Sequence, residues 1–395
     1  MEHQQSTLPS TGVPPELCDY IIDFLGDDKR ALSICSLVCK GWASRARFWQ
    51  FRSVQLSADR ATRLERLLRR NPQLGSLIRH VFFNLTKKPT LRAKNWIEET
   101  LRPLAVNLSA VNRLDLDAFP VSRKTLGILC MHFSSVEYLG IFRCLFEGHN
   151  ALFGLCSSLP LLQELQLHDP MIADGNWPPT PVQEIANPNL SVVRFTKRTY
   201  RDPFFQPLVK WLLSGDFHSA LRTFEIIDLE KSDIASMQEF LNAVGPTLQT
   251  LYIGPSDLGD SPPSDVMKAL DLTPCTGLLE LGIWDIRLHL SEVELGLTDW
   301  SLDWVICLLK QVRSPFLQHV QFYIHAGGVD YGHLSNLNWA GVAQALSDSH
   351  FGAPCRVTFT IVKARGNMKE LADHVKPLFG ALNGRIHWRV LCYGG

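Results

Sequence analysis

Residues 327–332 read Gly-Gly-Val-Asp-Tyr-Gly after a strand-like segment, a composition that could serve phosphate binding. Closely spaced glycines let backbone N–H groups surround an anion, and a lysine or the start of a helix normally completes such a site. Neither a lysine nor a helix start follows at the right place in this sequence. The stretch is therefore predicted to be a turn.

Cys130 and His132 are a nucleophile and a base by residue type, but they lie only two positions apart. Side chains at this spacing point in different directions on a helix, so they do not form a catalytic pair. The ten cysteines include no Cys-x-x-Cys pair, and the thirteen histidines show no spacing typical of metal ligands. The phosphate-loop, dinucleotide-binding, zinc-protease and serine-hydrolase motifs are also missing. We therefore expect a protein that is not an enzyme and has no cofactor or metal.

Length and composition indicate a folded intracellular protein. With 395 residues, 46% hydrophobic and 20% charged, the chain can bury a sizeable core in one large or two unequal domains. No apolar run approaches the roughly 20 residues that span a membrane, and the N-terminus lacks the features of a secretion signal. We expect a cytoplasmic or nuclear location, no membrane contact, free thiols, and disorder in residues 1–12.

Residues 13–52 are predicted to form three helices that present an apolar surface. Pro14 and Pro15 suit the first turn of a helix, which has no intrahelical partner for its N–H groups. Gly26 is expected to end this helix as a C-terminal glycine. Its apolar face consists of Leu17, Ile21, Ile22 and Leu25.

A second helix is expected to start after Asp27 and Asp28, which can cap it, and a third carries Trp42. About 40 residues is close to the lower limit for a self-sufficient core. Part of the apolar surface is therefore expected to be completed by a partner. The alternative is that the helices are a cap on the domain that follows.

The order of these residues resembles the F-box. The shared features are a Pro-x-Glu-Leu start, apolar residues at two successive steps of four, an Asp-initiated second helix, Val-Cys-x-x-Trp, and a final aromatic-Trp pair. In this sequence they are Pro14, Glu16, Leu17, Ile21, Leu25, Asp28, Leu32, Val38, Cys39, Trp42, Phe48 and Trp49. One departure is Val13, where the family usually has Leu before the first proline.

The resemblance implies that residues 13–52 bind a Skp-type adaptor and, through it, a cullin–RING ubiquitin ligase of the SCF type. The residues expected to face or support the adaptor are Pro14, Leu17, Ile21, Leu25, Leu32, Val38 and Trp42.

Charge is unevenly distributed, although the formal net charge is zero. Residues 1–28 carry six acids and no Lys or Arg, whereas residues 29–102 carry 17 Lys and Arg against four acids. A basic segment can indicate nucleic-acid binding. Here the arginines at 63, 66, 69 and 70 fit the solvated face of a helix whose other face holds Leu64, Leu67 and Leu68. We expect no nucleic-acid partner. In the F-box family the adaptor is acidic, which fits the same charges.

From residue 75 onward the sequence repeats one pattern: apolar, two variable residues, apolar, one variable residue, apolar. Nine copies occur, with middle residues 25 to 39 positions apart. They are Ile78/Val81/Phe83, Val111/Leu114/Leu116, Val136/Leu139/Ile141, Leu162/Leu165/Leu167, Leu190/Val193/Phe195, Leu221/Phe224/Ile226, Leu248/Leu251/Ile253, Leu278/Leu281/Ile283 and Leu317/Val320/Phe322. Because the last two apolar residues alternate with a variable one, each copy predicts a short strand with one buried face. Helical patterns lie between the copies, so the units must stack into a solenoid.

The arrangement resembles an irregular leucine-rich repeat domain. The Asn or Cys that usually follows the last apolar residue by three positions is mostly absent, and Cys144 is its clearest copy. We predict an α/β fold: the three-helix F-box (13–52), a linking helix (53–74), and a leucine-rich-repeat-like solenoid with a parallel sheet (75–395).

The array is expected to end with strand-like segments at 357–361 and 386–390. The proline-rich segments 177–181 and 254–264 are expected to be surface loops, and residues 285–299 an insertion.

The exposed face of the strands is the expected binding surface for a protein target, because residues beside the last two apolar positions point away from the core. These residues are Arg113, Asp115, Asp117, Tyr138, Phe142, Glu164, Gln166, His168, Arg194, Glu225, Tyr252, Glu280, Trp284, Gln321 and Tyr323. The four aromatics expected to contact the target are Phe142, Tyr252, Trp284 and Tyr323. With only two arginines in the row, an unmodified target is favoured over a phosphorylated one. The alternative is that loops cover these rings.

The sequence thus predicts the substrate-recognition subunit of an SCF-type ubiquitin ligase, which catalyses no bond chemistry itself. Three alternatives stay open: an adaptor-binding protein outside a ligase, a repeat scaffold whose N-terminal helices are a cap, and an enzyme with an unrecognised site.

Overall fold

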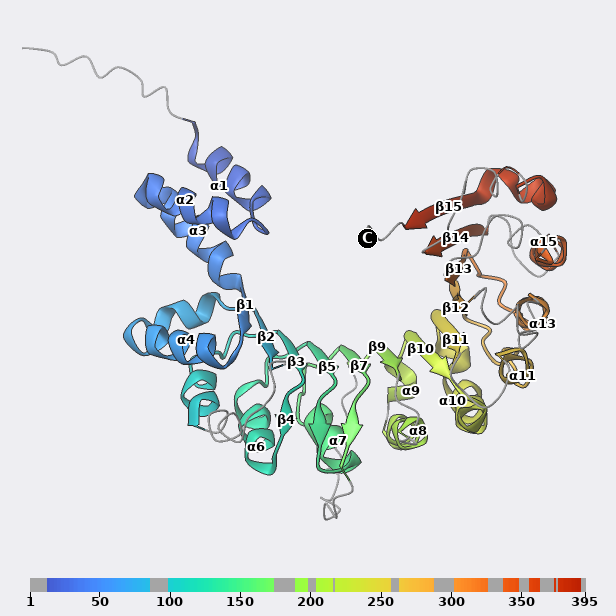
Figure 1. Ribbon diagram of the computed structural model, residues 1–395, viewed down its shortest axis with the longest axis horizontal. Coiled ribbons are helices and arrows are strands. Elements are labelled where there is room, and N and C mark those ends of the chain that lie inside the picture. The colour runs from blue at the N-terminus through green and yellow to red at the C-terminus, as the bar shows by residue number, and fades with distance from the viewer. Residues whose placement is uncertain are drawn as a thin grey trace, which may run out of the picture.

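A long curved sheet of parallel strands, with helices along its outer, convex side, dominates the computed structural model of the protein (Figure 1). A group of three helices stands at the N-terminal end of this arc. The structure describes residues 13–85, 99–173, 189–197, 204–215, 217–256, 263–287, 302–325, 337–347, 355–362, 373 and 376–391. The predicted α/β, leucine-rich-repeat-like architecture is confirmed.

The N-terminal unit consists of α1 (Pro15–Phe24), α2 (Lys29–Val38) and α3 (Lys40–Arg52). Asp28 caps α2, because its carboxylate accepts hydrogen bonds from the backbone N–H groups of Arg30 and Ala31 at 3.0 and 2.9 Å. The third helix has 13 residues and leads directly into the first strand of the sheet.

The main sheet has twelve strands, and every neighbouring pair is parallel. In sheet order they are β1 (Ser53–Leu56), β2 (His80–Asn84), β3 (Arg113–Asp117), β5 (Tyr138–Phe142), β7 (Glu164–His168), β9 (Val192–Thr196), β10 (Thr223–Leu229), β11 (Thr250–Pro255), β12 (Glu280–Arg287), β13 (His319–His325), β14 (Arg356–Val362) and β15 (Ile386–Leu391). The order along the sheet follows the order along the chain, as expected when stacked units each contribute one strand.

Each of the nine predicted copies of the apolar pattern coincides with one strand, from β2 to β13. All 27 apolar side chains of these copies are 0–2% exposed. Burying one face of every strand against the helices therefore specifies the register of the whole sheet. The two closing segments predicted from the sequence are β14 and β15.

The sheet begins earlier than the sequence reasoning placed it. Residues 53–74, predicted to be a linking helix, contain strand β1, which pairs in parallel with β2, and then α4 (Ala58–Arg70). This segment is thus a complete first unit of the solenoid. Phe51, Val54 and Leu56 follow the same apolar spacing as the nine copies, with Leu56 2% exposed.

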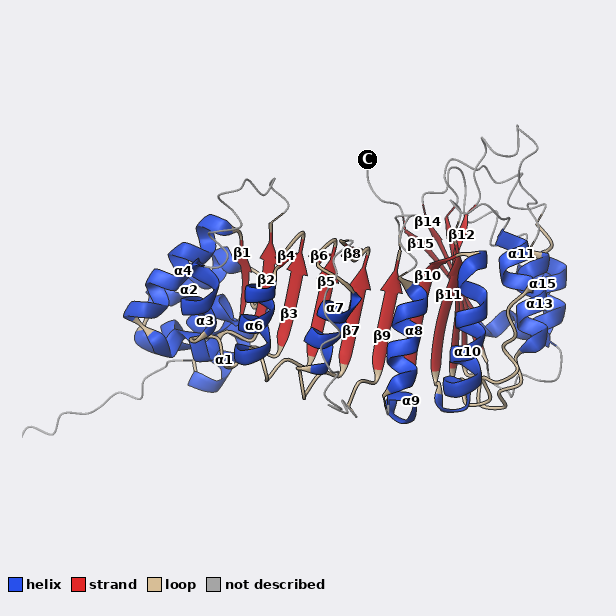
Figure 2. Ribbon diagram, turned by 90° about the horizontal axis from the view of Figure 1, so that it is seen from below, coloured by secondary structure: helices blue, strands red, loops and turns tan. Residues whose placement is uncertain are grey.

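Helices line the convex side of the sheet, opposite the face left open (Figures 1 and 2). After α4 and a helix at 99–105 they are α6 (Arg123–His132), α7 (His149–Ser157), α8 (Phe205–Ser214), α9 (Phe217–Ala220), α10 (Ile234–Val244), α11 (Pro263–Lys268), α13 (Asp303–Gln311) and α15 (Trp339–Ser347). The short 3₁₀ helices are η1 (Pro72–Leu77), η2 (Lys231–Asp233), η3 (Gly245–Thr247) and η4 (Lys376–Arg385). In α4, Leu64 and Leu68 are buried while Arg69 points outward and pairs with Glu65, as the sequence predicted for this helix.

Four units have a left-handed residue two positions after the last apolar residue of the pattern, directly after β3, β5 and β7 and within β10. Ala118, Arg143 and Asp169 each have a φ of 51°, and Asp228 has a φ of 70°. After β3, β5 and β7 this turn leads into a second, three-stranded sheet of β4 (Pro120–Val121), β6 (Leu145–Phe146) and β8 (Met171–Ile172). The turn therefore reverses the alternation of side chains at the strand end.

Cys144 lies directly after Arg143 of this turn and is fully buried. Its thiol donates to the carbonyl oxygen of Leu116 at 3.2 Å, which links two units. Burial raises the pKa of the Cys144 thiol to about 12, so it remains a protonated hydrogen-bond donor.

One predicted loop is partly wrong. Of the predicted loop 254–264, Gly254 and Pro255 belong to β11, and Pro263 and Ser264 belong to α11. Segments 177–181 and 327–332, and residues 288–299 of the predicted insertion, lie outside the described residues. No described helix is both long enough and apolar enough to cross a membrane.

Candidate functional site

Helix α1 carries apolar side chains on two opposite faces. Cys18 and Ile22 point inward and are buried, and Leu25 packs against the same core. On the outer face, side chains at i, i+3, i+4 and i+7 form a stripe with 49–75% exposure. They are Leu17, Tyr20, Ile21 and Phe24. A helix that is apolar on both sides is normally buried on both sides.

Helix α2 repeats this arrangement. Leu32 and Cys35 face the core, whereas Ile34, Leu37 and Val38 are 58–85% exposed. Of the fifteen exposed large apolar side chains among the described residues, eight lie between residues 13 and 38. Scattered exposed apolar residues need no explanation, but such a concentration is typical of surfaces that bind another molecule.

The core of the three-helix unit is small and separate from the core of the sheet. Its buried members are Ile22, Leu32, Cys35 and Ala46, with Leu25, Trp42 and Trp49 packed against them. Asp23 crosslinks the unit, because it accepts hydrogen bonds from Arg45 and, at 2.6 Å, from the Trp49 indole. The hydrogen bonds from Arg45 hold the pKa of the Asp23 carboxyl below its usual value.

The residues predicted for the adaptor surface divide into two groups. Pro14, Leu17, Ile21 and Val38 are exposed. Leu25 and Trp42 are half-buried, and Leu32 is 0% exposed. Leu32 therefore supports the surface from inside the core and does not form part of it.

Two details of the sequence reasoning are corrected. Leu17, Ile21, Ile22 and Leu25 do not form one face, since the helix turns Ile22 and Leu25 inward. Gly26 does not adopt a left-handed conformation. A glycine is needed at position 26 because the Trp49 ring packs closely against it: a Cβ there would lie 2.9 Å from that ring. Tyr20, Phe24 and Ile34 were missed, although the spacing of 17, 20, 21 and 24 could have shown the outer stripe.

The second candidate surface is the concave face of the sheet, which the convex helices leave open (Figure 1). Polar side chains on neighbouring strands bind one another across it. Arg194 on β9 pairs with Glu164 on β7 and with Glu225 on β10. Burial raises the pKa of Glu225, and the positive charge of Arg194 opposes that rise.

Further along, Glu280 accepts a hydrogen bond from Gln321 at 2.5 Å and lies 3.0 Å from Nδ1 of His319. Burial, and then the hydrogen bond to Glu280, raises the pKa of the Tyr252 hydroxyl. Such contacts fix the concave side chains in place before any partner binds.

Three of the four aromatics predicted to bind a target come together. Trp284 stacks on Tyr323 with ring centroids 4.7 Å apart, and Tyr252 meets Trp284 edge-on at 5.6 Å. The rings are half-buried against one another and not fully exposed as the sequence suggested. Gly282 makes room for this cluster, because a Cβ there would lie 1.9 Å from the Tyr252 ring. Phe142 lies apart from them, on β5.

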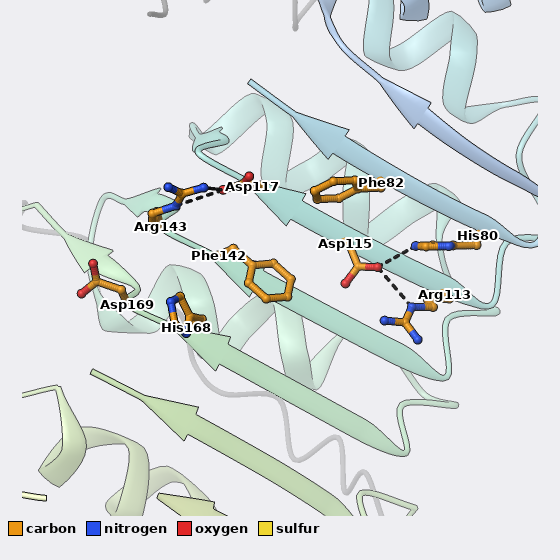
Figure 3. Close-up of a pocket in the computed structure, with 9 residues that line it drawn as sticks. All are labelled: His80, Phe82, Arg113, Asp115, Asp117, Phe142, Arg143, His168 and Asp169. Atoms are coloured by element: carbon orange, nitrogen blue, oxygen red, sulfur yellow. Dashed lines mark hydrogen bonds and ion pairs between the residues drawn. The ribbon is translucent and has the colours of Figure 1, made fainter. Parts of the chain in front are cut away.

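Phe142 instead lines a pocket of about 410 Å³ on the concave face of the first units (Figure 3). The residues around this pocket are His80, Phe82, Arg113, Asp115, Asp117, Phe142, Arg143, His168 and Asp169. The alternation of side chains along the strands predicted that five of them lie on this face: Arg113, Asp115, Asp117, Phe142 and His168. Arg143 and Asp169 were missed because their left-handed backbone turns them out of the strand alternation. Arg143 adds a second guanidinium to the pocket beside that of Arg113, and it binds Oδ1 of Asp117 at 2.7 Å.

A chain of hydrogen bonds runs along one side of this pocket. Ser53 lies 2.9 Å from Nδ1 of His80, and Nε2 of His80 lies 2.6 Å from Oδ2 of Asp115. The residue types are those of a serine hydrolase, in which such a chain activates the serine. Ser53, however, does not line the pocket, and Arg113 also binds Asp115 at 3.1 Å. The chain therefore acts here to orient Asp115.

Asp115 is the unusual polar group of the pocket. Its side chain is 6% exposed, and both donors bind its Oδ2. Its Oδ1 is buried and has no hydrogen-bond partner within the described residues. A buried acceptor without a donor costs about 1–3 kcal/mol of stability. No cluster of potential metal ligands occurs in the described parts of the chain.

Comparison with known proteins adds little to this geometry. Neither a protein-family model nor a curated protein sequence matches the chain. A solved structure of a yeast complex of Rad7 and Elc1 is similar, with 13% sequence identity and a TM-score of 0.42. The similarity covers 95% of this chain and 92% of that chain. The residues described above therefore carry the functional assignment by themselves.

Proposed function

We propose that this protein is the substrate-recruiting subunit of an SCF-type cullin–RING ubiquitin ligase. Residues 13–52 bind a Skp-type adaptor through the outer faces of α1 and α2. The concave face of the sheet binds a protein target. The chain itself performs no bond chemistry.

The apolar outer stripe of α1 is the observation that carries this proposal. Leu17 and Ile21 are 53% and 49% exposed while Ile22, on the opposite side, is fully buried. Exposing these side chains to water is unfavourable, since burying one apolar side chain contributes about 1.5–3 kcal/mol of free energy. A second polypeptide that covers the stripe would gain this free energy of burial. The resemblance to the F-box implies that this polypeptide is a Skp-type adaptor.

The mechanism is tethering. An adaptor bound to the N-terminal helices and a target held in the concave face are bound to the same chain, so the target stays close to the ligase. Ubiquitin transfer then becomes effectively intramolecular, and raised local concentration increases its rate without new contacts.

Co-purification with a Skp-type adaptor tests the proposal. The double variant Leu17→Asp/Ile21→Asp should fold normally, since neither side chain belongs to the core, and should lose the adaptor. Met131→Asp on α6 is the matched control, because Met131 is 62% exposed but lies on the convex side of the sheet. The control should retain the adaptor.

Absence of the adaptor from the wild-type complex would favour the alternative that the helices are only a cap. Equal retention by all three proteins would show that the adaptor does not bind the α1 stripe. If the adaptor binds as proposed, adding a cullin to the purified complex separates a ligase subunit from an adaptor-binding protein outside a ligase. Failure of the cullin to join would overturn the ligase assignment.

A further inference from the structure

The pocket on β2, β3, β5 and β7 contains the carboxylate of Asp115, of which only one oxygen has hydrogen-bond partners in the described chain. His80 and Arg113 both bind Oδ2 of Asp115, at 2.6 and 3.1 Å. Its other oxygen, Oδ1, has no hydrogen-bond partner in the described chain. In Figure 3 this oxygen points toward the ring of Phe142. A group that donates a hydrogen bond is the missing partner.

The space for that oxygen exists because the next strand carries a glycine. Gly140 lies directly opposite Asp115 in the register of β3 and β5. A Cβ on Gly140 would lie 2.1 Å from Oδ1 of Asp115 and 2.7 Å from the ring edge of Phe142. Any other residue would displace the carboxylate or the ring. The glycine therefore leaves room for both Oδ1 of Asp115 and the ring edge of Phe142 above the strand.

The charges around the pocket favour a cationic donor. Three carboxylates, at Asp115, Asp117 and Asp169, face two guanidiniums, at Arg113 and Arg143, so the formal charge is −1 with neutral histidines. Both guanidiniums already bind carboxylates of the pocket. An anionic ligand would add a fourth negative charge, whereas a cationic one brings the pocket to neutrality.

We propose that this pocket binds a basic side chain, arginine or lysine, presented by a protein partner. The cationic head donates to Oδ1 of Asp115 once the ring of Phe142 turns aside. The methylene stem packs between Phe82 and Phe142, whose rings also attract the cation. The identity of this partner as a ligase target rests on the proposed function, whereas the chemistry of the pocket does not.

Short peptides test the pocket on the full-length protein. The probes are acetylated and amidated pentapeptides of glycine whose central residue is Arg, Lys, citrulline or Glu, and binding is measured by saturation-transfer NMR titration. We expect the Arg and Lys peptides to bind. The citrulline peptide keeps three of the five N–H donors of arginine but lacks the charge, so it should bind about tenfold more weakly. The Glu peptide should not bind. Equal binding of the Arg and citrulline peptides, or preferential binding of the Glu peptide, would overturn the proposal.

Two variants locate the binding. Asp115→Asn removes the charge and Gly140→Ala occupies the space above the strand, so each should weaken the Arg peptide about tenfold. Gly127→Ala is the control, because a Cβ there meets nothing within 4 Å. Unchanged binding in Gly140→Ala would contradict the proposal. Should Asp115→Asn fail to fold, the comparison of peptides on the wild-type protein decides the question. No adaptor is present in these measurements, so their outcome is independent of the adaptor test.

Discussion

Leu32→Ala is expected to unfold the three-helix unit while the sheet stays folded. Leu32 is one of only four buried side chains in the core of this unit, and it is 0% exposed. Truncating a buried leucine to alanine costs about 2–5 kcal/mol, because a cavity remains. A core of about 40 residues has little stability to lose. The sheet has its own core, so the two should separate in an unfolding experiment.

Limited trypsin digestion measures this effect, because Arg30, Lys40 and Arg45 lie within the unit. In Leu32→Ala these sites should be cut much faster than in the wild-type protein. Ile34→Ala is the matched control on the same helix, since Ile34 is 62% exposed and its truncation should change stability by less than about 0.5 kcal/mol. Equal protection of the two variants would show that the unit does not depend on its own core.

Gly75→Ala is expected to destabilise the sheet domain by about 1–3 kcal/mol, the usual cost of overpacking a buried site. Gly75 lies in η1, three residues before Ile78, and a Cβ there would lie 1.9 Å from the backbone oxygen of Asn107 in the next unit. Gly245 occupies the same place before Leu248, and its Cβ would lie 2.9 Å from the backbone of Pro274. A glycine three residues before the first apolar residue of the pattern thus lets neighbouring units approach each other closely.

Chemical unfolding of Gly75→Ala against Gly127→Ala checks this prediction. Gly127 lies in α6 with open space around it, so alanine there should stabilise the helix by up to about 1 kcal/mol. Opposite signs for the two substitutions are expected. Equal effects would mean that the units can separate enough to admit a methyl group.

Much of the fold was predictable because its main determinant is local. Every strand from β2 to β13 in the main sheet carries the same spacing of three apolar residues, and burial of that face fixes the register. Strand β1 was missed for a reason that lies in the sequence. Phe51, Val54 and Leu56 have the right spacing, but residues 53–74 were predicted to be a linking helix because of the amphipathic, arginine-rich pattern around residues 63–70.

The binding surfaces were less predictable. Alternation along a strand placed Asp115 and Phe142 on the concave face, but it cannot reveal which oxygen of a carboxylate lacks a partner. Arg143 and Asp169 were not predicted because their own left-handed conformation at the strand end reverses the alternation of side chains. Arginine rarely adopts this conformation, so the sequence does not indicate it. In α1, a single apolar stripe was expected because the sequence does not tell which neighbour each face meets.

Amide hydrogen exchange of the full-length protein, alone and with a purified Skp-type adaptor, tests most directly whether a second chain completes the N-terminal helices. Adaptor binding should slow exchange in α1 and α2, residues 15–38, and leave the strands of the sheet unchanged, because the outer apolar faces lie on these two helices. Unchanged exchange in both helices, or slowing confined to the sheet, would contradict the proposed function.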